Sequence, residues 1–110
     1  MFREQFKCKC CGVEKMDTAF LIHLRDLSHI LGDDWFVTSA YRCSSHNKAV
    51  GGGENSQHLY GRAVDLAAPF GKVKARIVEF AMTNGFSVGV YAGFIHIDCR
   101  PIDSQVVWNG

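Results

Sequence analysis

Residues 94–99 read FIHIDC and give the clearest strand signal in the chain. Successive side chains of a strand point to opposite faces. His96 and Asp98 are therefore expected to share one face, while Ile95 and Ile97 point into an apolar layer on the other. The pattern predicts a strand that is half core and half polar site.

A second segment, residues 62–67 with the sequence RAVDLA, alternates more weakly and places Asp65 among small and apolar neighbours. A carboxylate in such surroundings is costly to bury unless it is paired or bound to a metal ion. His58 lies seven positions earlier, on a loop that Gly61 allows to turn tightly. If this strand is next to 94–99, two imidazoles and one or two carboxylates converge, which is the donor set of an open zinc site. A hydrogen-bonded core histidine without a metal is the alternative that spacing leaves open.

The other elements follow from periodicity and from end signals. Apolar residues at intervals of three and four predict one helix from Asp17 or Thr18 to Leu31 and a second over residues 72–83. Shorter elements are expected at 35–39 (strand), 44–50 (helical turns) and 105–108 (edge strand). Because helices and strands segregate, the predicted class is α+β, with two or three helices packed on a small antiparallel sheet. The length predicts a single domain over residues 1–110.

Composition excludes several classes of protein. Hydrophobic residues make up 47% of the 110 residues and charged residues 21%, which is typical of a folded globular chain. The net charge of +1 lacks the basic excess of a nucleic-acid-binding domain. No apolar run is long enough to cross a membrane. Residues 1–7 lack the apolar stretch of a signal peptide, so we expect synthesis in the cytoplasm without one. Separately, we expect the protein to be a monomer.

The chain has an odd number of cysteines, namely Cys8, Cys10, Cys11, Cys43 and Cys99. The first three resemble half of a zinc knuckle, but no downstream cysteine pair at ligand spacing completes it. The plainer interpretation is a structural role in an N-terminal turn. The alternative is a second zinc site that combines Cys8, Cys10 or Cys11 with Cys43.

Four segments together resemble the M15 family of zinc peptidases: TSAYR (38–42), HNKAVGG (46–52), SQHLYGRAVD (56–65) and GFIHIDCR (93–100). This family includes D-alanyl-D-alanine carboxypeptidases and phage endolysins, and the hedgehog signalling domain shares its metal-site fold. The resemblance extends from Phe6 to Arg100. It implies that His58, Asp65 and His96 bind one Zn²⁺.

The resemblance also assigns residues around the metal. Arg42 falls where family members hold a substrate carboxylate or backbone carbonyl, and its planar guanidinium suits that task. Independently of the resemblance, Ser56 and Gln57 precede His58 and are candidates for hydrogen bonds to substrate or to the metal shell. Tyr91 is a candidate donor to a developing oxyanion. A structural role explains each of the three more simply.

One departure from the family concerns the general base. Relatives place an acidic residue a few positions before the last histidine, but residues 88–95 contain no carboxylate. Asp98 is therefore predicted to be the base, and Glu54 is the second candidate. Asp98 has two other possible roles, which are to orient His96 or to pair with Arg100.

The resemblance implies a zinc metallopeptidase that hydrolyses a stem or cross-link peptide of bacterial peptidoglycan, of the D-Ala-D-Ala carboxypeptidase or endopeptidase type. A phage lysin or virion-associated enzyme, which acts on the wall after release, fits a chain without a signal peptide. Two alternatives remain, which are a zinc-binding but inactive interaction module and a D,D-dipeptidase that acts on a free small substrate.

Overall fold

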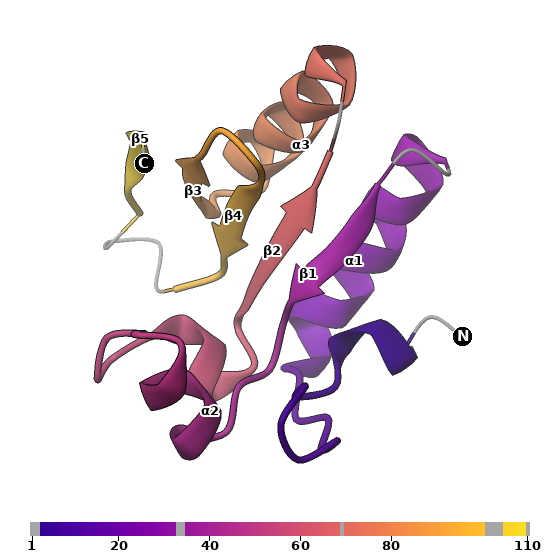
Figure 1. The fold of residues 1–110 in the computed structure, drawn as a ribbon. Helices are drawn as coiled ribbons and strands as arrows, with labels where there is room; N and C mark the ends of the chain where they lie inside the picture. Colours follow the sequence, from indigo (N-terminus) through magenta and orange to yellow (C-terminus); the bar gives the residue numbers. More distant parts are fainter. Residues whose placement is uncertain (1–2, 33–34, 69, 101–104, 110) are drawn as a thin grey trace.

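A computed structural model describes residues 3–32, 35–68, 70–100 and 105–109. Figure 1 shows helices and strands together, and the predicted α+β class is confirmed. The elements in chain order are the 3-10 helix η1 (Arg3–Phe6), α1 (Thr18–Leu31), β1 (Phe36–Ser39), α2 (Ser44–Ala49), the 3-10 helix η2 (Gln57–Tyr60), β2 (Ala63–Ala67), α3 (Gly71–Thr83), β3 (Ser87–Val90), β4 (Ile95–Asp98) and β5 (Val107–Asn109).

In the described part of the chain, five strands form one sheet in the order β1-β2-β4-β3-β5. The pairs β1–β2, β2–β4 and β4–β3 are antiparallel, as predicted. The expectation of a purely antiparallel sheet is wrong at β5, which pairs parallel to β3. Strands β3 and β5 both run opposite to β4, one before it and one after it in the chain. They therefore point the same way where β5 pairs with the free edge of β3.

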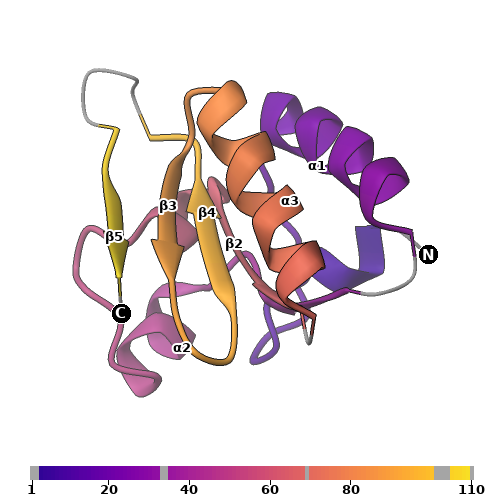
Figure 2. The ribbon, with the colours of Figure 1, turned by 90° about the horizontal axis from the view of Figure 1, so that it is seen from above.

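Helices α1 and α3 lie side by side on one face of the sheet (Figure 2). Helix α1 begins where the sequence predicts, because the side chain of Asp17 accepts a hydrogen bond from the backbone N–H of Phe20 at 3.0 Å. It ends at Gly32, which adopts a positive φ of 67°. Its buried stripe consists of Phe20, Leu21, Leu24, Leu27 and Leu31.

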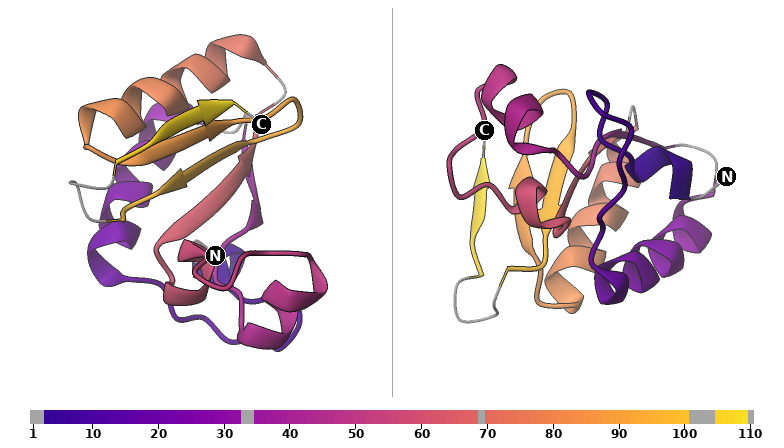
Figure 3. Two further views of the ribbon diagram at one scale, coloured as in Figure 1. Left: turned by 90° about the vertical axis from the view of Figure 1, so that its left-hand side faces the viewer. Right: turned by 90° about the horizontal axis from the view of Figure 1, so that it is seen from below.

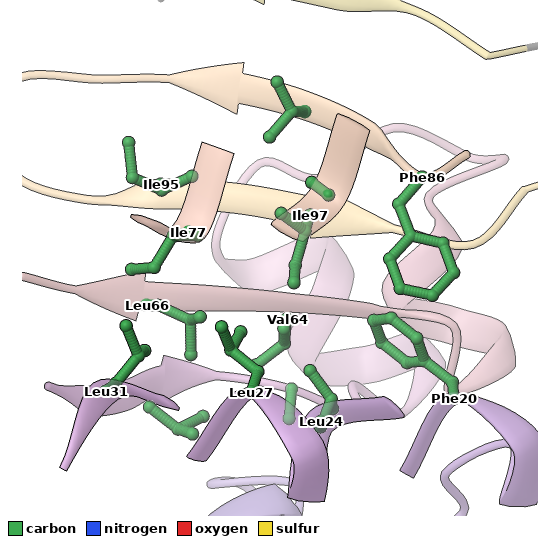
Figure 4. Close-up of a cluster of buried hydrophobic side chains, with 14 of the residues drawn as sticks. Phe20, Leu24, Leu27, Leu31, Val64, Leu66, Ile77, Phe86, Ile95 and Ile97 are labelled. Atoms are coloured by element: carbon green, nitrogen blue, oxygen red, sulfur yellow. The ribbon is translucent and has the colours of Figure 1, made fainter. Parts of the chain in front are cut away.

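The apolar faces of β2 and β4 meet these helices in the core (Figure 4). Val64, Leu66, Ile95 and Ile97 are fully buried there, and Ile77 of α3 packs among them. Burial of each such side chain contributes about 1.5–3 kcal/mol, so this layer fixes how the two strands sit. The packing thereby also fixes the positions of the side chains on the opposite face of these two strands.

Helix α2, η2 and the N-terminal loop lie on that opposite side of the sheet (Figure 3). Gly61 ends η2 in the left-handed region, with φ 67° and ψ 26°. A Cβ atom at this position would collide with the carbonyl oxygen of Lys15, so glycine is required for both conformation and space. The turn delivers the chain from η2 directly into β2.

Candidate metal centre

The pairing of β2 with β4 places Asp65 directly opposite His96, and Ala63 opposite Asp98. The two strands are therefore neighbours, the condition on which the sequence prediction depended. His58, Asp65 and His96 each offer a donor atom, and these atoms lie within 4.8 Å of one another.

His58 is held in one orientation by its surroundings. The residue is 3% exposed, and its Nδ1–H donates to the carbonyl oxygen of Ala40 at 2.7 Å. Because a carbonyl oxygen only accepts, Nδ1 carries a proton, and in the neutral ring the lone pair resides on Nε2. Nε2 faces Asp65 at 3.4 Å from Oδ1. The free lone pair thus points into the group, as a metal ligand requires.

His96 lies between two carboxylates on the polar face of β4. Its Nδ1 is 2.8 Å from Oδ1 of Asp65, and its Nε2 is 2.8 Å from Oδ2 of Asp98. Burial lowers the pKa of His96, but the two carboxylates more than reverse this, so the net shift is upward. For Asp65, burial raises the pKa, while the two histidines depress it far below its usual range.

Asp98 is fully buried and has two partners. The Arg100 side chain donates to it from Nε to Oδ1 at 2.8 Å and from Nη2 to Oδ2 at 2.7 Å, and the Arg100 backbone N–H donates to Oδ1 at 3.2 Å. Burial raises the pKa of Asp98, but Arg100 and then His96 lower it to about 2. The carboxylate is therefore ionised and bound to both Arg100 and the outer nitrogen of His96.

Arg42 follows β1 and reaches the group from the side. Its Nη2 donates to Oδ2 of Asp65 at 3.4 Å, while Nε donates to Ser39 Oγ at 3.1 Å. Its Nη1 donates to Oδ1 of Asn47 at 3.3 Å. Asp65 thus presents one oxygen to the two histidines and the other to Arg42.

The histidine-asparagine pair at 46–47 fixes the glycine-rich loop. Asn47 is buried, and its Nδ2 donates to the carbonyl oxygen of Gly53 at 2.9 Å. A Cβ atom at Gly52 would collide with the Asn47 amide, so this glycine lets the loop close over α2. His46 lies outside the donor group.

The other candidate residues of this region, Glu54, Ser56 and Gln57, are not part of the donor group. Glu54 is exposed and does not line the cleft that contains the donor group. The Ser56 hydroxyl accepts from the His58 backbone N–H at 3.3 Å, which is a capping role. Gln57 lines the cleft, and its buried Oε1 accepts no hydrogen bond from the residues that the structure describes.

The donor group lies in a cleft of about 590 Å³ whose other wall is aromatic. The Trp108 ring is 5.3 Å from that of His96, and its Nε1–H donates to the Tyr91 hydroxyl at 2.7 Å. Tyr91 in turn stacks on Phe94 at 4.4 Å. This role of Trp108 was not predicted from the sequence. The signal that could have found it is Gly89, a glycine inside a strand, which often marks a close approach; a Cβ there would collide with the Trp108 ring.

The residues present fit a divalent metal ion. Two imidazoles and one carboxylate are the donors of open, catalytic metal sites, in which a further position is left for water or substrate. The fixed tautomer of His58 and the outer hydrogen bond from His96 to Asp98 are the second-layer contacts that such ligands require. The fold thus positions a donor set that suits a metal-dependent enzyme with an open metal position.

Comparison with known families agrees with this class. The family model described as Peptidase M15 matches residues 2–98. The chain therefore belongs to the Peptidase M15 family, whose members are metallopeptidases. None of the curated proteins compared with it is similar enough to count as a match. Among the described residues, no helix has the length and apolar character of a membrane span.

Proposed function

We propose that the chain is a zinc peptidase that hydrolyses the stem or cross-link peptide of bacterial peptidoglycan, as a D-Ala-D-Ala carboxypeptidase or endopeptidase. The convergence of His58, Asp65 and His96 in a cleft that Arg42 also lines is the observation that carries this proposal. Zinc is favoured because a site with two imidazoles and one carboxylate matches its preferred ligands and leaves one position open.

His58, Asp65 and His96 would hold the ion. When bound, zinc polarises a scissile carbonyl and lowers the pKa of a water molecule toward about 7. Ala40 keeps the proton of His58 on Nδ1, away from the ion. The chain itself therefore supplies ligands that need little rearrangement.

Arg42 is proposed to bind the substrate. Its guanidinium lies at the edge of the cleft and its side chain is 15% exposed, so a peptide carboxylate or carbonyl can reach it. The contacts with Ser39 and Asn47 fix the direction of its planar group. A substrate held there is oriented toward the donor group, and orientation of this kind is a large part of catalysis.

The role of Asp98 as general base stays a prediction. Its contacts with His96 and Arg100 instead favour the role of orienting His96. A carboxylate with a pKa of about 2 is also a weak base near neutral pH. An Asp98→Ala variant that still binds zinc but no longer hydrolyses the peptide would support the base role. Glu54→Ala is the matched comparison.

A zinc-binding but inactive interaction module is the second candidate. The observation that favours it is the full engagement of Asp98, together with the exposed position of Glu54 outside the cleft. A D,D-dipeptidase acting on a free small substrate is the third. The phage lysin or virion-associated role is part of the proposal and rests on the sequence resemblance.

The deciding experiment incubates the zinc-loaded chain with purified peptidoglycan, defined muropeptides and free D-Ala-D-Ala. Mass spectrometry of the products identifies the cleaved bond. We expect new amino termini or D-Ala from the polymer, and none from His58→Ala. Zinc binding with no product from any of the three substrates would overturn the enzyme proposal in favour of the interaction module. Product from the free dipeptide alone would favour the dipeptidase.

A further inference from the structure

Three cysteine side chains gather outside the centre described above. Cys8 and Cys11 lie in the N-terminal loop after η1, and Cys43 precedes α2. Their Sγ atoms lie within 4.8 Å of one another, and none of them forms a disulfide. We propose that Cys8, Cys11 and Cys43 form a second metal site, which binds a thiolate-preferring ion of the Zn²⁺ class. This proposal does not depend on the peptidase activity.

The N-terminal loop has the shape that brings two cysteine ligands together. The Gly12 N–H donates to the Cys8 carbonyl at 2.8 Å, and the Cys8 N–H donates to the Val13 carbonyl at 2.7 Å. Gly12 has φ 73°, which lets the chain turn directly after Cys11. Two cysteines three positions apart on such a turn have the spacing of structural zinc sites.

Cys43 completes the group from a segment 35 residues away, and the backbone there favours sulfur anions. The Cys43 N–H donates to Cys8 Sγ at 3.4 Å, and the His46 N–H donates to Cys43 Sγ at 3.4 Å. Burial raises the pKa of the Cys8 thiol, but backbone N–H groups of Cys43, Cys11 and Cys10 lower it to about 6. Hydrogen bonds to the sulfurs are the outer contacts that orient metal-bound thiolates.

A structural zinc ion takes four ligands. Cys10 is exposed and its thiol contacts that of Cys43, so it is the candidate for the fourth position. Cys99 is not in the group, and burial raises the pKa of its thiol to about 11. Cys99 therefore provides a matched control thiol.

The site would connect the N-terminal loop to the segment that positions the catalytic residues. The carbonyl of Phe6 accepts from the Tyr41 N–H at 3.3 Å, and Arg42 is the residue before Cys43. The Arg42 N–H in turn donates to the His58 carbonyl at 3.1 Å. An ion bound by the cysteines would thus hold in place the short segment from which Arg42 projects.

The test uses the full, reduced, metal-free chain titrated with Co²⁺, since cobalt bound to thiolate gives a sulfur-to-metal charge-transfer absorption that nitrogen and oxygen ligands do not give. We expect about two Co²⁺ per chain and a strong charge-transfer band. The band should persist in a His58→Ala/His96→Ala variant, which retains about one ion. It should also persist in Cys99→Ser, and disappear in Cys43→Ser and Cys11→Ser.

Thiol reactivity of the wild-type chain gives a second readout that needs no variant to fold. With zinc bound, the clustered cysteines should react with a thiol reagent more slowly than after removal of zinc by a chelator, while Cys99 is unchanged. The proposal is overturned if reduced chain shows no charge-transfer band, or if Cys43→Ser retains it in full. It is equally overturned if the chain purified without reductant contains a disulfide within the cluster and no metal there.

Discussion

The two faces of β2 and β4 are made by alternate residues of the same short segments, yet they are held together in different ways. On one face Val64, Leu66 and Ile97 pack into a layer without polar atoms, where attraction is non-directional. On the other, Asp65 and His96 are fixed by hydrogen bonds between specified atoms. The fold therefore separates stability from chemistry through the alternation of side chains along each strand. Substitutions on the apolar face should therefore change stability and largely preserve the chemistry of the site. Substitutions on the polar face should do the reverse.

The largest effect is expected from Asp65→Asn, which preserves shape but removes the anionic ligand. Metal should be lost from the centre, and peptide hydrolysis should fall by about a thousandfold or more, because a catalytic metal supplies several kcal/mol of stabilisation to the transition state. Elemental analysis and product release measure both, and circular dichroism should show an intact fold. Asp26→Asn, at an exposed position of α1, is the control. Zinc content equal to the wild type in Asp65→Asn would contradict the ligand assignment.

Truncation on the apolar face tests the other half of the comparison. Ile97→Ala should reduce the free energy of unfolding by about 2–5 kcal/mol, since it removes buried methylene groups and leaves a cavity. The rate per folded molecule should change little. Urea denaturation gives the stability, and Ile22→Ala, at a position 61% exposed, should change it by less than about 0.5 kcal/mol. Equal losses from the two variants would show that the layer is not the main source of stability.

Asp98 lies on the polar face but is as buried as a core residue, and it contacts His96, a proposed metal ligand. Asp98→Asn should weaken metal binding by about 10–100-fold, the usual effect of removing an outer hydrogen-bond partner of a histidine ligand. Competition with a chromophoric chelator measures the affinity, and Glu54→Gln should leave it unchanged. An affinity equal to that of the wild type would remove Asp98 from the orienting role.

Acidification of the metal-free chain should protonate Asp98, weaken its contacts with Arg100 and His96, and so lower the free energy of unfolding. The pKa of Asp98 is about 2 in the fold, against 3.8 for an ordinary aspartate side chain. Since the folded value is the lower one, this stabilisation is fully present above about pH 4 and is lost as the pH falls toward about 2. The loss is about 2 kcal/mol. Asp98→Asn should flatten this part of a stability-against-pH curve, and an unchanged slope would contradict the assignment.

The smallest effect is expected from Tyr91→Phe, which removes only the acceptor of the Trp108 N–H. The free energy of unfolding should fall by about 1 kcal/mol, and hydrolysis should change by less than about tenfold. Steady-state kinetics on a defined muropeptide measure the second quantity. A drop in kcat of more than about a hundredfold would instead make Tyr91 a donor to the developing oxyanion.

Strand alternation predicted much of this arrangement because it is a local rule. The pattern around Asp65 and His96 indicated which side chains share a face, and the pairing of β2 with β4 confirms that they meet. The predicted helices agree with α1 and α3 to within a residue at each end, since caps and apolar periodicity are also local signals.

The parts that were not predicted depend on contacts between distant segments. Strand β3 carries no clear alternation, because Gly89 interrupts it and both of its faces are covered. The parallel pairing of β5 depends on where the chain returns after β4, which no local pattern encodes. The position of Trp108 against His96 follows from that pairing, so the aromatic wall of the cleft was missed with it.

The closeness of Trp108 to His96 has an optical consequence. The chain has two tryptophans, and the other, Trp35, donates its indole N–H to the Gly32 carbonyl at the end of α1. With Trp35 replaced by phenylalanine, the tryptophan fluorescence of the chain would come from a single indole whose ring lies 5.3 Å from the imidazole of His96, a proposed metal ligand. A paramagnetic ion such as Co²⁺ or Cu²⁺ at the centre should then quench the emission, whereas an ion held by the cysteine cluster should affect it far less. Tryptophan emission would therefore show which of the two proposed metal sites binds the ion first.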